Sequence, residues 1–388
     1  MKHIVLVEPN LCGHHEMYLK YFTKVMLSLN CKTTIISIDI EAVDLLFPAE
    51  QCNDLINFSK IKYKRNLLLK GKGIKKKFIV VVNSIISVYN LYILKKKIPK
   101  DCSLVFFCTV DDYMNDFIPI YLFDFIMHYK WGGLYLQANR NNKVKCFDKR
   151  KLFLSKRCIA VAILGKASPF LSNLINNKIV IFPDFTETSL PEKEYFLAQE
   201  IRKKANGRKI VSLLGAIASR KGLKTFINTT TILDESDFFY VLAGEGAETS
   251  ITKEEIQLIN SQFKNKSNCF YHPEKIISDE DFNSLIDCSD IIYAAYIDFE
   301  YSSNMLTKAS FFRKPIIVSK GYYMEEVVNK HRIGLAIEQN NSTQCRDAIL
   351  SLSSRDFIHN IKPEFDLFYK DNSIDVLYSR FSHIHDRC

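Results

Sequence analysis

The sequence lacks the cysteine patterns of disulfide-rich and zinc-binding proteins. Its eleven cysteines are scattered over 388 residues, without a CxxC pair and without the Cys and His spacing of a zinc site. The run "KHIVLVEP" after Met1 is too short and too polar for a signal peptide. We therefore expect reduced cysteines, no bound metal and a cytoplasmic location.

Long apolar runs are absent as well. The best candidate for a membrane span is "FIVVVNSIISVYNLYIL", residues 78–94. Its 17 residues fall short of the roughly 20 that span a bilayer. Asn83, Ser84, Ser87 and Asn90 interrupt the run at spacings of one, three and three, which places them on one stripe of a helix. We expect an amphipathic helix there, not a membrane span.

Acidic residues are missing from the region around this helix. Residues 60–100 contain thirteen Lys or Arg and no Asp or Glu, so the net charge of +10 leaves −3 for the remainder of the chain. Two interpretations stay open: a helix that covers a sheet with its lysines solvated, or a helix whose lysines and apolar face meet an anionic membrane surface. A nucleic-acid groove is disfavoured, because apart from Tyr63 the aromatic residues lie within the helix and not between the lysines.

What the sequence does contain is a regular alternation of short apolar strands with helix-length segments. This alternation is typical of parallel sheets that are covered by helices on both faces. A chain of 388 residues exceeds what one hydrophobic core usually supports, so we expect an α/β protein with two domains and one sheet in each. The expected strands are "HIVLVEP", "TTIISIDI", "CSLVFFCTV", "GLYLQA", "CIAVAIL" and "KIVIFPD", then "KIVSLLGAI", "FFYVLAGEG", "DIIYAAY", "PIIVS" and "GLAIE".

A change of composition marks the boundary between the domains. The segment "PDFTETSLPEKEY", residues 183–195, has two prolines, four acidic residues and little apolar content. We expect an N-terminal domain over residues 1–184, a linker over 185–205 and a C-terminal domain over 206–371. A last helix, about residues 372–388, is expected to return to the N-terminal domain.

In the N-terminal domain, glycine and histidine follow the first strand in "EPNLCGHHEMYLKYF". Gly13 would let the backbone approach a ligand, and His14 or His15 would stand at the start of the next helix, at the edge where parallel sheets bind ligands. A tight turn with solvated histidines is the alternative. We expect Gly13 and His14 to line an acceptor cleft, together with Asp111.

The acidic segment "TVDDYMND" admits a metal site formed by Asp111, Asp112 and Asp116. Acids at such positions more often cap a helix, and Asp112 precedes the apolar segment "YMNDFIPIYLFDFIMHY". We therefore expect Asp112 to be an N-cap and no metal to bind.

In the C-terminal domain, two glycine loops follow successive strands. Gly215 ends a strand in "LLGAIASRKGLKTF", and Arg220 and Lys221 stand just before the next helix. Basic residues at a helix N-terminus oppose the helix dipole, which favours a bound anion there. The second loop, "YVLAGEGAE", would bring three more residues to the same edge: Gly244, Glu245 and Gly246.

A third segment, "FEYSSNMLTKASFFRKPIIVS", sets a carboxylate before a helix. Glu300 precedes a first turn made of Ser302, Ser303 and Asn304. The free N–H groups at a helix N-terminus suit a phosphate, whereas a serine that merely caps the helix is the alternative.

In their order and spacing, these motifs resemble those of glycosyltransferase family 4, retaining enzymes with the GT-B fold of two facing Rossmann-like domains. Gly215, the pair Lys221-Gly222, "AGEG" and Glu300 match the family's motifs, and the likeness covers about residues 208–338. The sequence departs from the family at Ala216 and Lys308, where the family has an Arg and the second Glu of Glu-x7-Glu.

The resemblance implies an enzyme that transfers a sugar from a nucleotide-sugar donor to a glycan or lipid-linked acceptor, in cell-envelope or surface polysaccharide synthesis. It implies retention and neither cofactor nor metal. A catalytically inactive nucleotide-sugar binder and a basic nucleic-acid-binding protein are the alternatives. The implied catalytic residues are Glu300, Lys221 and Arg220, and the implied donor-binding residues are Gly215, Gly244, Glu245, Gly246, Ser302, Ser303 and Asn304.

Overall fold

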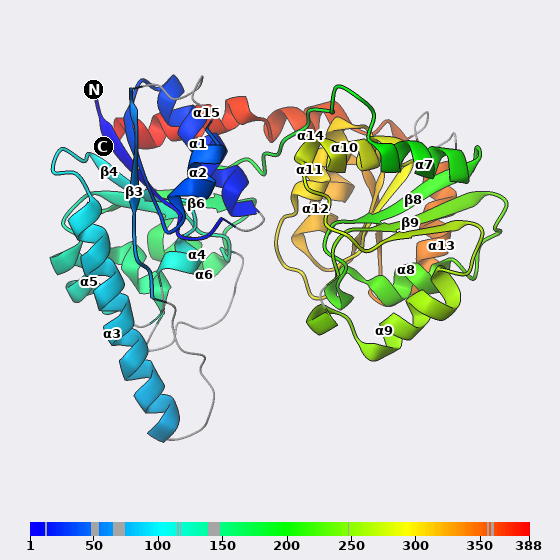
Figure 1. Ribbon diagram of the computed structural model, residues 1–388, viewed down its shortest axis with the longest axis horizontal. Helices are drawn as coiled ribbons and strands as arrows, with labels where there is room; N and C mark the ends of the chain where they lie inside the picture. The colour runs from blue at the N-terminus through cyan, green and yellow to red at the C-terminus, as the bar shows by residue number, and fades with distance from the viewer. Residues whose placement is uncertain are drawn as a thin grey trace. The chain divides into compact units, whose positions relative to one another are not determined.

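The computed structural model describes residues 1–11, 14–47, 54–64, 74–114, 116, 118–138, 148–246, 248–354, 357 and 361–388. It divides the chain into two compact units (Figure 1): unit 1 is Met1–Pro183 with Ile374–Cys388, and unit 2 is Asp184–Ser373. Each unit is built on a sheet whose described strands all pair in parallel. The expected α/β fold with two Rossmann-like domains is confirmed.

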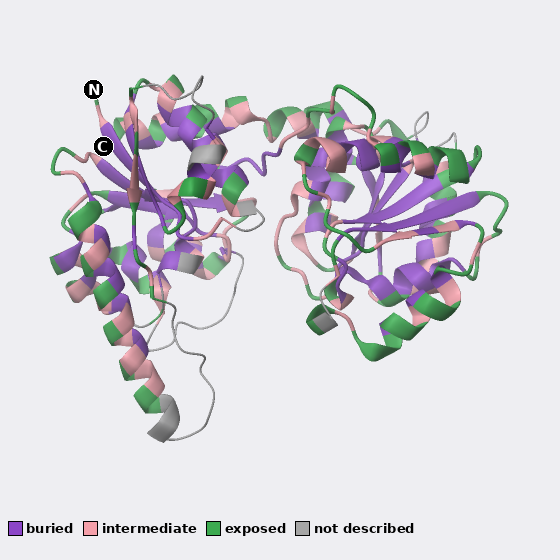
Figure 2. Ribbon diagram, in the orientation of Figure 1, coloured by how far each residue is buried: buried purple, intermediate pink, exposed green. Residues whose placement is uncertain are grey.

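Within the described residues, the sheet of unit 1 has seven strands in the order β3-β2-β1-β4-β5-β6-β7. Figure 2 shows its strands as mainly buried, in agreement with their continuous apolar sequences. The strands are β1 His3–Val7, β2 Lys32–Ser37, β3 Ile56–Lys60, β4 Leu104–Phe107, β5 Trp131–Leu134, β6 Cys158–Leu164 and β7 Ile179–Phe182. The helices are α1 His14–Ser28, α2 Ile40–Leu45, α3 Ile74–Lys97, α4 Val110–Tyr113, α5 Ile120–Ile126, α6 Pro169–Ile175 and α15 Ile374–Asp386.

Unit 2, as far as it is described, has six strands in the order β10-β9-β8-β11-β12-β13. Helices α8 and α13 pack together on one face of the sheet, and α7 and α10 pack together on the other (Figure 1). The strands are β8 Lys209–Leu214, β9 Phe238–Ala243, β10 Cys269–His272, β11 Ile291–Ala294, β12 Ile316–Ser319 and β13 Gly334–Ile337. The helices are α7 Phe196–Ala205, α8 Leu223–Thr229, α9 Lys253–Leu258, α10 Asp279–Cys288, α11 Asn304–Phe311, α12 Tyr323–His331, α13 Ser342–Ser353 and α14 Phe365–Asp371.

The strands β3 and β10 are missing from the sequence-based expectation. Both lie at the edge of their sheet, where a strand pairs on one side only. All residues of β3 are half-buried or exposed, and β10 has one fully buried residue, Phe270. An edge strand of this kind needs no continuous apolar run, and such a run is the signal by which the other strands are recognised.

The expected linker over residues 185–205 is too long. Residues 196–205 form α7, whose Leu197, Ala198, Ile201 and Ala205 are buried in the hydrophobic core of unit 2. These apolar residues recur at helical spacing, so the helix buries one face and belongs to the domain.

The last helix, α15, lies in unit 1 although it follows all of unit 2 in the chain. Its Phe381 packs between aromatic rings of α1, β4 and β7, with centroid distances of 5.0 Å to Phe22 and 4.9 Å to Phe106 and to Phe182. Buried aromatic contacts of this size stabilise the return of the chain to unit 1.

The single helix expected after Asp112 is in fact two short helices, α4 and α5. Thr109 is the N-cap of α4 and Pro119 that of α5, so the expected N-cap role of Asp112 is wrong. Pro119 has no N–H group, and its ring disfavours a helical conformation of the preceding residue, which separates the two helices.

Candidate active site

Two glycine loops run side by side at the carboxyl edge of the unit 2 sheet. Beyond the ends of β8 and β9, Gly215 N donates to Ala243 O (2.9 Å) and Ile217 N donates to Glu245 O (2.7 Å). A Cβ atom on Gly244 would lie 2.2 Å from the carbonyl oxygen of Gly215, so only glycine permits this contact. The two loops bring together four of the expected donor-binding residues: Gly215, Gly244, Glu245 and Gly246.

Lys221 is buried at the same edge, at the end of the short 3-10 helix Ser219–Lys221. Its side chain is 8% exposed, and its Nζ donates to Leu214 O at 2.8 Å and lies 5.6 Å from the ring centre of Tyr296. Burial, and after it the charge of Arg220, lower the pKa of Lys221 to about 8. A buried ammonium group lacks the water that would stabilise its charge, and a bound anion can stabilise the charge instead. Lys221, which is buried beside two backbone loops, is therefore suited to bind an anion.

The loop from β11 to α11 forms a third part of this edge. Ile297 N donates to Arg220 O at 2.7 Å, which ties this loop to the one that holds Lys221. The strands β8 and β11 are neighbours at the point where the strand order reverses, and open parallel sheets bind ligands there. Glu300 is exposed on this loop.

The hydroxyl groups at the start of α11 bond within the protein. Ser303 is the N-cap of the helix and accepts from Met305 N at 3.4 Å, so the capping alternative applies to this residue. Ser302 donates to the buried carboxylate of Asp184 at 2.5 Å. Burial raises the pKa of Asp184 to about 6, against the lowering effect of Ser302. Because Met305 N and Leu306 N both bond to Ser303, this segment offers a phosphate mainly the positive end of the helix dipole at Asn304.

The two departures from the family pattern differ in their surroundings. Ala216 is exposed on the glycine loop, and Arg220 is exposed nearby. Lys308 is 2% exposed, and its Nζ donates to Asn283 Oδ1 at 2.6 Å and to Glu187 O at 2.8 Å. Lys308 therefore ties α11 to α10 and to the first segment of unit 2.

In unit 1, the carboxyl ends of β1 and β4 hold a cluster of which the sequence analysis named only His15, as the alternative to His14. The buried carboxylate of Glu8 lies 3.2 Å from His15 Nδ1, and it accepts from Thr109 Oγ1 at 3.2 Å and from Asn10 N at 3.1 Å. Burial raises the pKa of Glu8, and the contact with His15 opposes this rise. His15 was signalled by its position after the first strand, whereas an acid such as Glu8 directly after a strand is common and by itself indicates no site.

The structure places the other residues that were expected to form sites in unit 1 as follows. Gly13 lies outside the described residues, and of His14 the structure describes the backbone, as the first residue of α1. Asp111 accepts from Leu136 N at 2.7 Å and is paired with Lys149, so it joins the loops after β4 and β5. Asp116 accepts from Lys149 N at 2.9 Å. No group of three or more potential metal ligands occurs in the part of the chain that is described.

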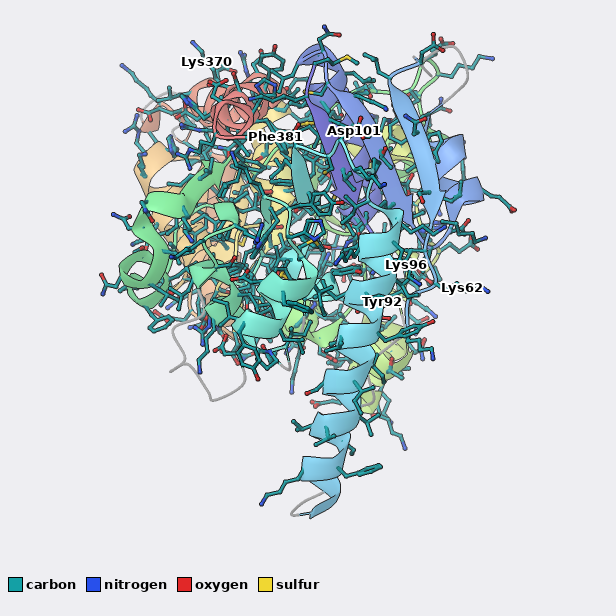
Figure 3. The ribbon with its side chains drawn as sticks, turned by 90° about the vertical axis from the view of Figure 1, so that its left-hand side faces the viewer. Lys62, Tyr92, Lys96, Asp101, Lys370 and Phe381 are labelled. Atoms are coloured by element: carbon teal, nitrogen blue, oxygen red, sulfur yellow. The ribbon has the colours of Figure 1, made fainter. Side chains whose placement is uncertain are left out.

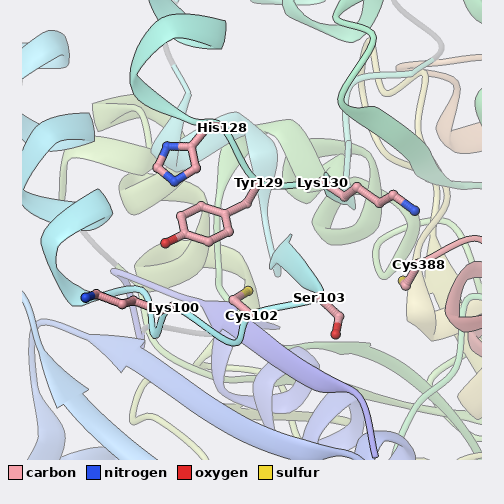
Figure 4. A pocket seen from close by; sticks show the side chains of 7 residues that line it. All are labelled: Lys100, Cys102, Ser103, His128, Tyr129, Lys130 and Cys388. Carbon is pink, nitrogen blue, oxygen red and sulfur yellow. The ribbon is translucent and has the colours of Figure 1, made fainter.

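A shallow hollow of about 740 Å³ lies at the opposite edge of the unit 1 sheet (Figure 4). Ser103 and Lys130, at the amino ends of β4 and β5, line it together with the thiols of Cys102 and Cys388. Burial raises the pKa of Cys102 to about 12 and that of Cys388 to about 11, so both thiols stay protonated and weakly nucleophilic. Because the hollow lies at the amino ends of the strands, it is separate from the Glu8 cluster at their carboxyl ends.

Residues 197–362 match the family model described as "Glycosyl transferases group 1", and the matched segment lies within unit 2. No curated protein matches the chain in sequence. The family match confirms the resemblance to glycosyltransferases over residues 197–362, and it identifies the chain as an enzyme of the glycosyltransferase class (EC 2.4).

Solved structures with the same fold include a glycosyltransferase from Rickettsia africae ESF-5, at 17% identity and a TM-score of 0.68, covering 100% of this chain and 98% of that one. Anabaena HepE in complex with UDP and glucose has 12% identity and a TM-score of 0.69, with both chains fully covered. Sucrose-phosphate synthase from Thermosynechococcus elongatus has 11% identity and a TM-score of 0.66, covering 100% and 99%. At these identities the likeness shows the GT-B fold.

Proposed function

We propose that the protein transfers a sugar from a nucleotide-sugar donor to a glycan or lipid-linked acceptor, in the synthesis of a cell-envelope or surface polysaccharide. The observation that carries the proposal is the buried Lys221 beside two interlocked glycine loops. The reaction keeps the configuration of the sugar and uses no metal. The protein works in the cytoplasm, at the inner face of a membrane.

The proposed chemistry follows from the charge that develops on the leaving group. When the bond between sugar and diphosphate breaks, negative charge grows on the diphosphate, and fixed positive groups stabilise that charge. Lys221, Arg220 and the positive end of the α11 dipole are the positive groups at this edge. Glu300 accepts hydrogen bonds from the hydroxyl groups of the sugar. The departing diphosphate takes the proton of the acceptor hydroxyl, so no enzymic base is assigned.

The first test measures donor binding without knowledge of the acceptor. Since HepE has been seen with UDP and with UDP-glucose, uridine nucleotides lead a thermal-shift panel of nucleotides and nucleotide sugars. A ligand at a hundred times its Kd stabilises by about 2.7 kcal/mol, which raises the Tm by several degrees. We expect Glu300→Ala to keep the shift given by the nucleotide and to lose the extra shift given by its sugar.

A panel in which no nucleotide and no nucleotide sugar shifts the Tm would contradict the proposal. A chain that binds the donor but neither hydrolyses it nor transfers its sugar would be the catalytically inactive binder. Ala216 and the inward-bonded Lys308 are the observations that favour this second candidate.

On the acceptor side, we propose that His15 binds a hydroxyl group of the acceptor, with Glu8 fixing its ring through Nδ1. Loss of one such hydrogen bond costs about tenfold. We expect His15→Ala to lower kcat/KM for the acceptor by about this factor and to leave the donor thermal shift unchanged. His128→Ala, on the edge that holds the hollow, is the control and should leave both values unchanged. A His15→Ala variant with full kcat/KM would refute this role.

A further inference from the structure

The polar stripe of α3 faces inward. Asn83, Ser87 and Asn90 are 1% to 3% exposed, although they are the residues that make the helix look amphipathic. The side chain of Asn90 accepts from Lys64 N at 3.0 Å and donates to Lys64 O at 2.8 Å. Tyr113 OH donates to Asn90 O at 3.1 Å. This stripe therefore fastens α3 to unit 1 by hydrogen bonds.

The apolar face of the same helix points outward. Five of its apolar and aromatic residues are 38% to 66% exposed: Phe78, Val81, Ile85, Tyr89 and Tyr92. They recur every three or four residues and form one stripe along the helix. Figure 2 shows α3 as mostly half-buried and exposed, and Figure 3 places Tyr92 on this helix. Because α3 exposes its apolar face to solvent and buries its polar face, the exposed face is a candidate for binding another molecule or a membrane.

A second exposed apolar pair lies on a neighbouring helix. Helix α5 packs against α3, and its Tyr121 and Phe125 are 75% and 81% exposed. These residues stand four apart, on one side of α5. A helix in contact with α3 thus also exposes apolar side chains.

Lysines surround this apolar stripe. Lys77 at one end and Lys96 and Lys97 at the other are exposed. The ammonium groups of Lys64 and Lys96 lie 4.5 Å and 4.4 Å from the ring centres of Tyr89 and Tyr92. Since residues 60–100 contain no acid, every charged side chain on α3 itself is a lysine.

We propose that this face of α3 lies flat on an anionic lipid bilayer. Its apolar side chains enter the boundary between headgroups and acyl chains, and its lysines contact lipid phosphates. The inference deepens the proposed function, because it names the surface at which a lipid-linked acceptor is met, but its physical basis in α3 is independent of that function.

The helix does not span the membrane in this proposal. By length and composition Lys77–Lys97 could cross a membrane, and 28% of its apolar 18-residue window is buried in the protein. Its carboxyl-terminal half, however, places Leu91 and Leu94 in the hydrophobic core of unit 1, next to the hydrogen bonds of Asn90. Insertion across a bilayer would break these contacts and expose buried polar groups to hydrocarbon.

A second copy of the chain is a poorer occupant of this face. A two-fold interface sets the same patch against itself. Because lysines stand at both ends of α3, parallel and antiparallel pairings both bring lysines together. Anionic lipid complements the charge that a second copy would repel.

The test is a vesicle co-sedimentation assay on the full chain without donor. We expect binding to phosphatidylcholine vesicles that contain about 30% phosphatidylglycerol, and little binding to pure phosphatidylcholine. Binding should weaken as salt rises above about 0.15 M. Reversing Lys96 and Lys97 to Glu should lower affinity more than about 30-fold, since each lysine contributes about a factor of five.

Ile85→Glu should release the protein from the vesicles, whereas Ile277→Glu, at a residue 91% exposed in unit 2, should not. The donor thermal shift, which does not involve α3, should be the same in all variants. Binding that ignores lipid charge, or that survives Ile85→Glu, would overturn the proposal. So would a concentration-dependent dimer that Ile85→Glu abolishes, which would identify a second copy as the partner.

Discussion

Replacing Lys221 by methionine is expected to lower kcat by a factor of about 100 to 1,000 while the fold stays intact. Loss of a fixed group that stabilises charge in the transition state costs about 2.7 to 4 kcal/mol. In the proposed mechanism Lys221 is such a group, and it is buried beside the glycine loops with its Nζ donating to Leu214 O. Initial rates of sugar transfer or donor hydrolysis measure the effect.

The same substitution should not lower the free energy of unfolding at neutral pH. Burial lowers the pKa of Lys221 from its ordinary 10.5 to about 8, so keeping the charge in the folded state costs on the order of 3 kcal/mol. Between pH 8 and 10.5 the unfolded chain binds more protons at this residue. The stability of the native protein therefore gains a contribution that rises with pH across this window. Lys221→Met should lack this contribution, which urea unfolding at several pH values can detect.

Lys224→Met is the matched control. Lys224 lies in α8 three residues further on, half exposed, and its partner is the exposed Glu254. Loss of a surface ion pair of this kind changes stability by about 0 to 1 kcal/mol, and we expect full activity. Equal losses of activity in Lys221→Met and Lys224→Met would show that Lys221 has no special role.

Gly244→Ala is expected to be the most destabilising change in the donor loops. The new Cβ would lie 2.2 Å from the carbonyl oxygen of Gly215, and the φ of residue 244 is +137°. Backbone cannot move aside as a flexible side chain can, so the two loops must separate. Overpacking and an unfavourable φ together cost about 3 kcal/mol or more. Thermal unfolding should show the loss, and the donor thermal shift should disappear.

Gly321→Ala separates the effect of the unfavourable φ from the effect of the steric overlap. Its φ of +89° is also unfavourable for alanine, but no atom lies within 4 Å of the new Cβ. We expect a cost of about 1 to 2 kcal/mol and an unchanged donor shift. If both alanine variants lost the same stability and kept donor binding, the close contact between the glycine loops would not be needed for donor binding.

The sequence was informative where a local pattern decides the structure. Strands that are buried on both faces must be apolar throughout, and such runs revealed eleven strands. The edge strands β3 and β10 stayed hidden because pairing with a neighbour, and not their own composition, makes them strands. In the same way, α7 looked like part of a linker, because acidic residues precede a helix whose apolar face is short.

The sequence also predicted that the residues assigned to the donor meet at one edge of a sheet, but it did not predict the cluster around Glu8. Gly215, Lys221, Gly244 and Glu300 follow strands in a fixed order, and parallel strands place their carboxyl ends at one edge. The cluster around Glu8 joins residues separated by about a hundred positions, such as Thr109, and no local pattern links them. The expected first turn of Ser302, Ser303 and Asn304 is wrong, because the helix begins at Asn304 with Ser303 as its N-cap. Only the structure shows that the hydroxyl groups of Ser302 and Ser303 bond within the protein.

Helix α3 shows most clearly which features the sequence determines and which the tertiary structure determines. By itself the sequence determined that a helix carries a polar stripe, an apolar stripe and flanking lysines, because helical spacing alone fixes which residues share a face. Which stripe turns inward depends on the partners that unit 1 offers. The backbone of Lys64 satisfies Asn90, and a buried hydrogen-bonded amide costs little, so the apolar residues are left outside. The tertiary structure alone decided that this protein presents a cationic, apolar surface.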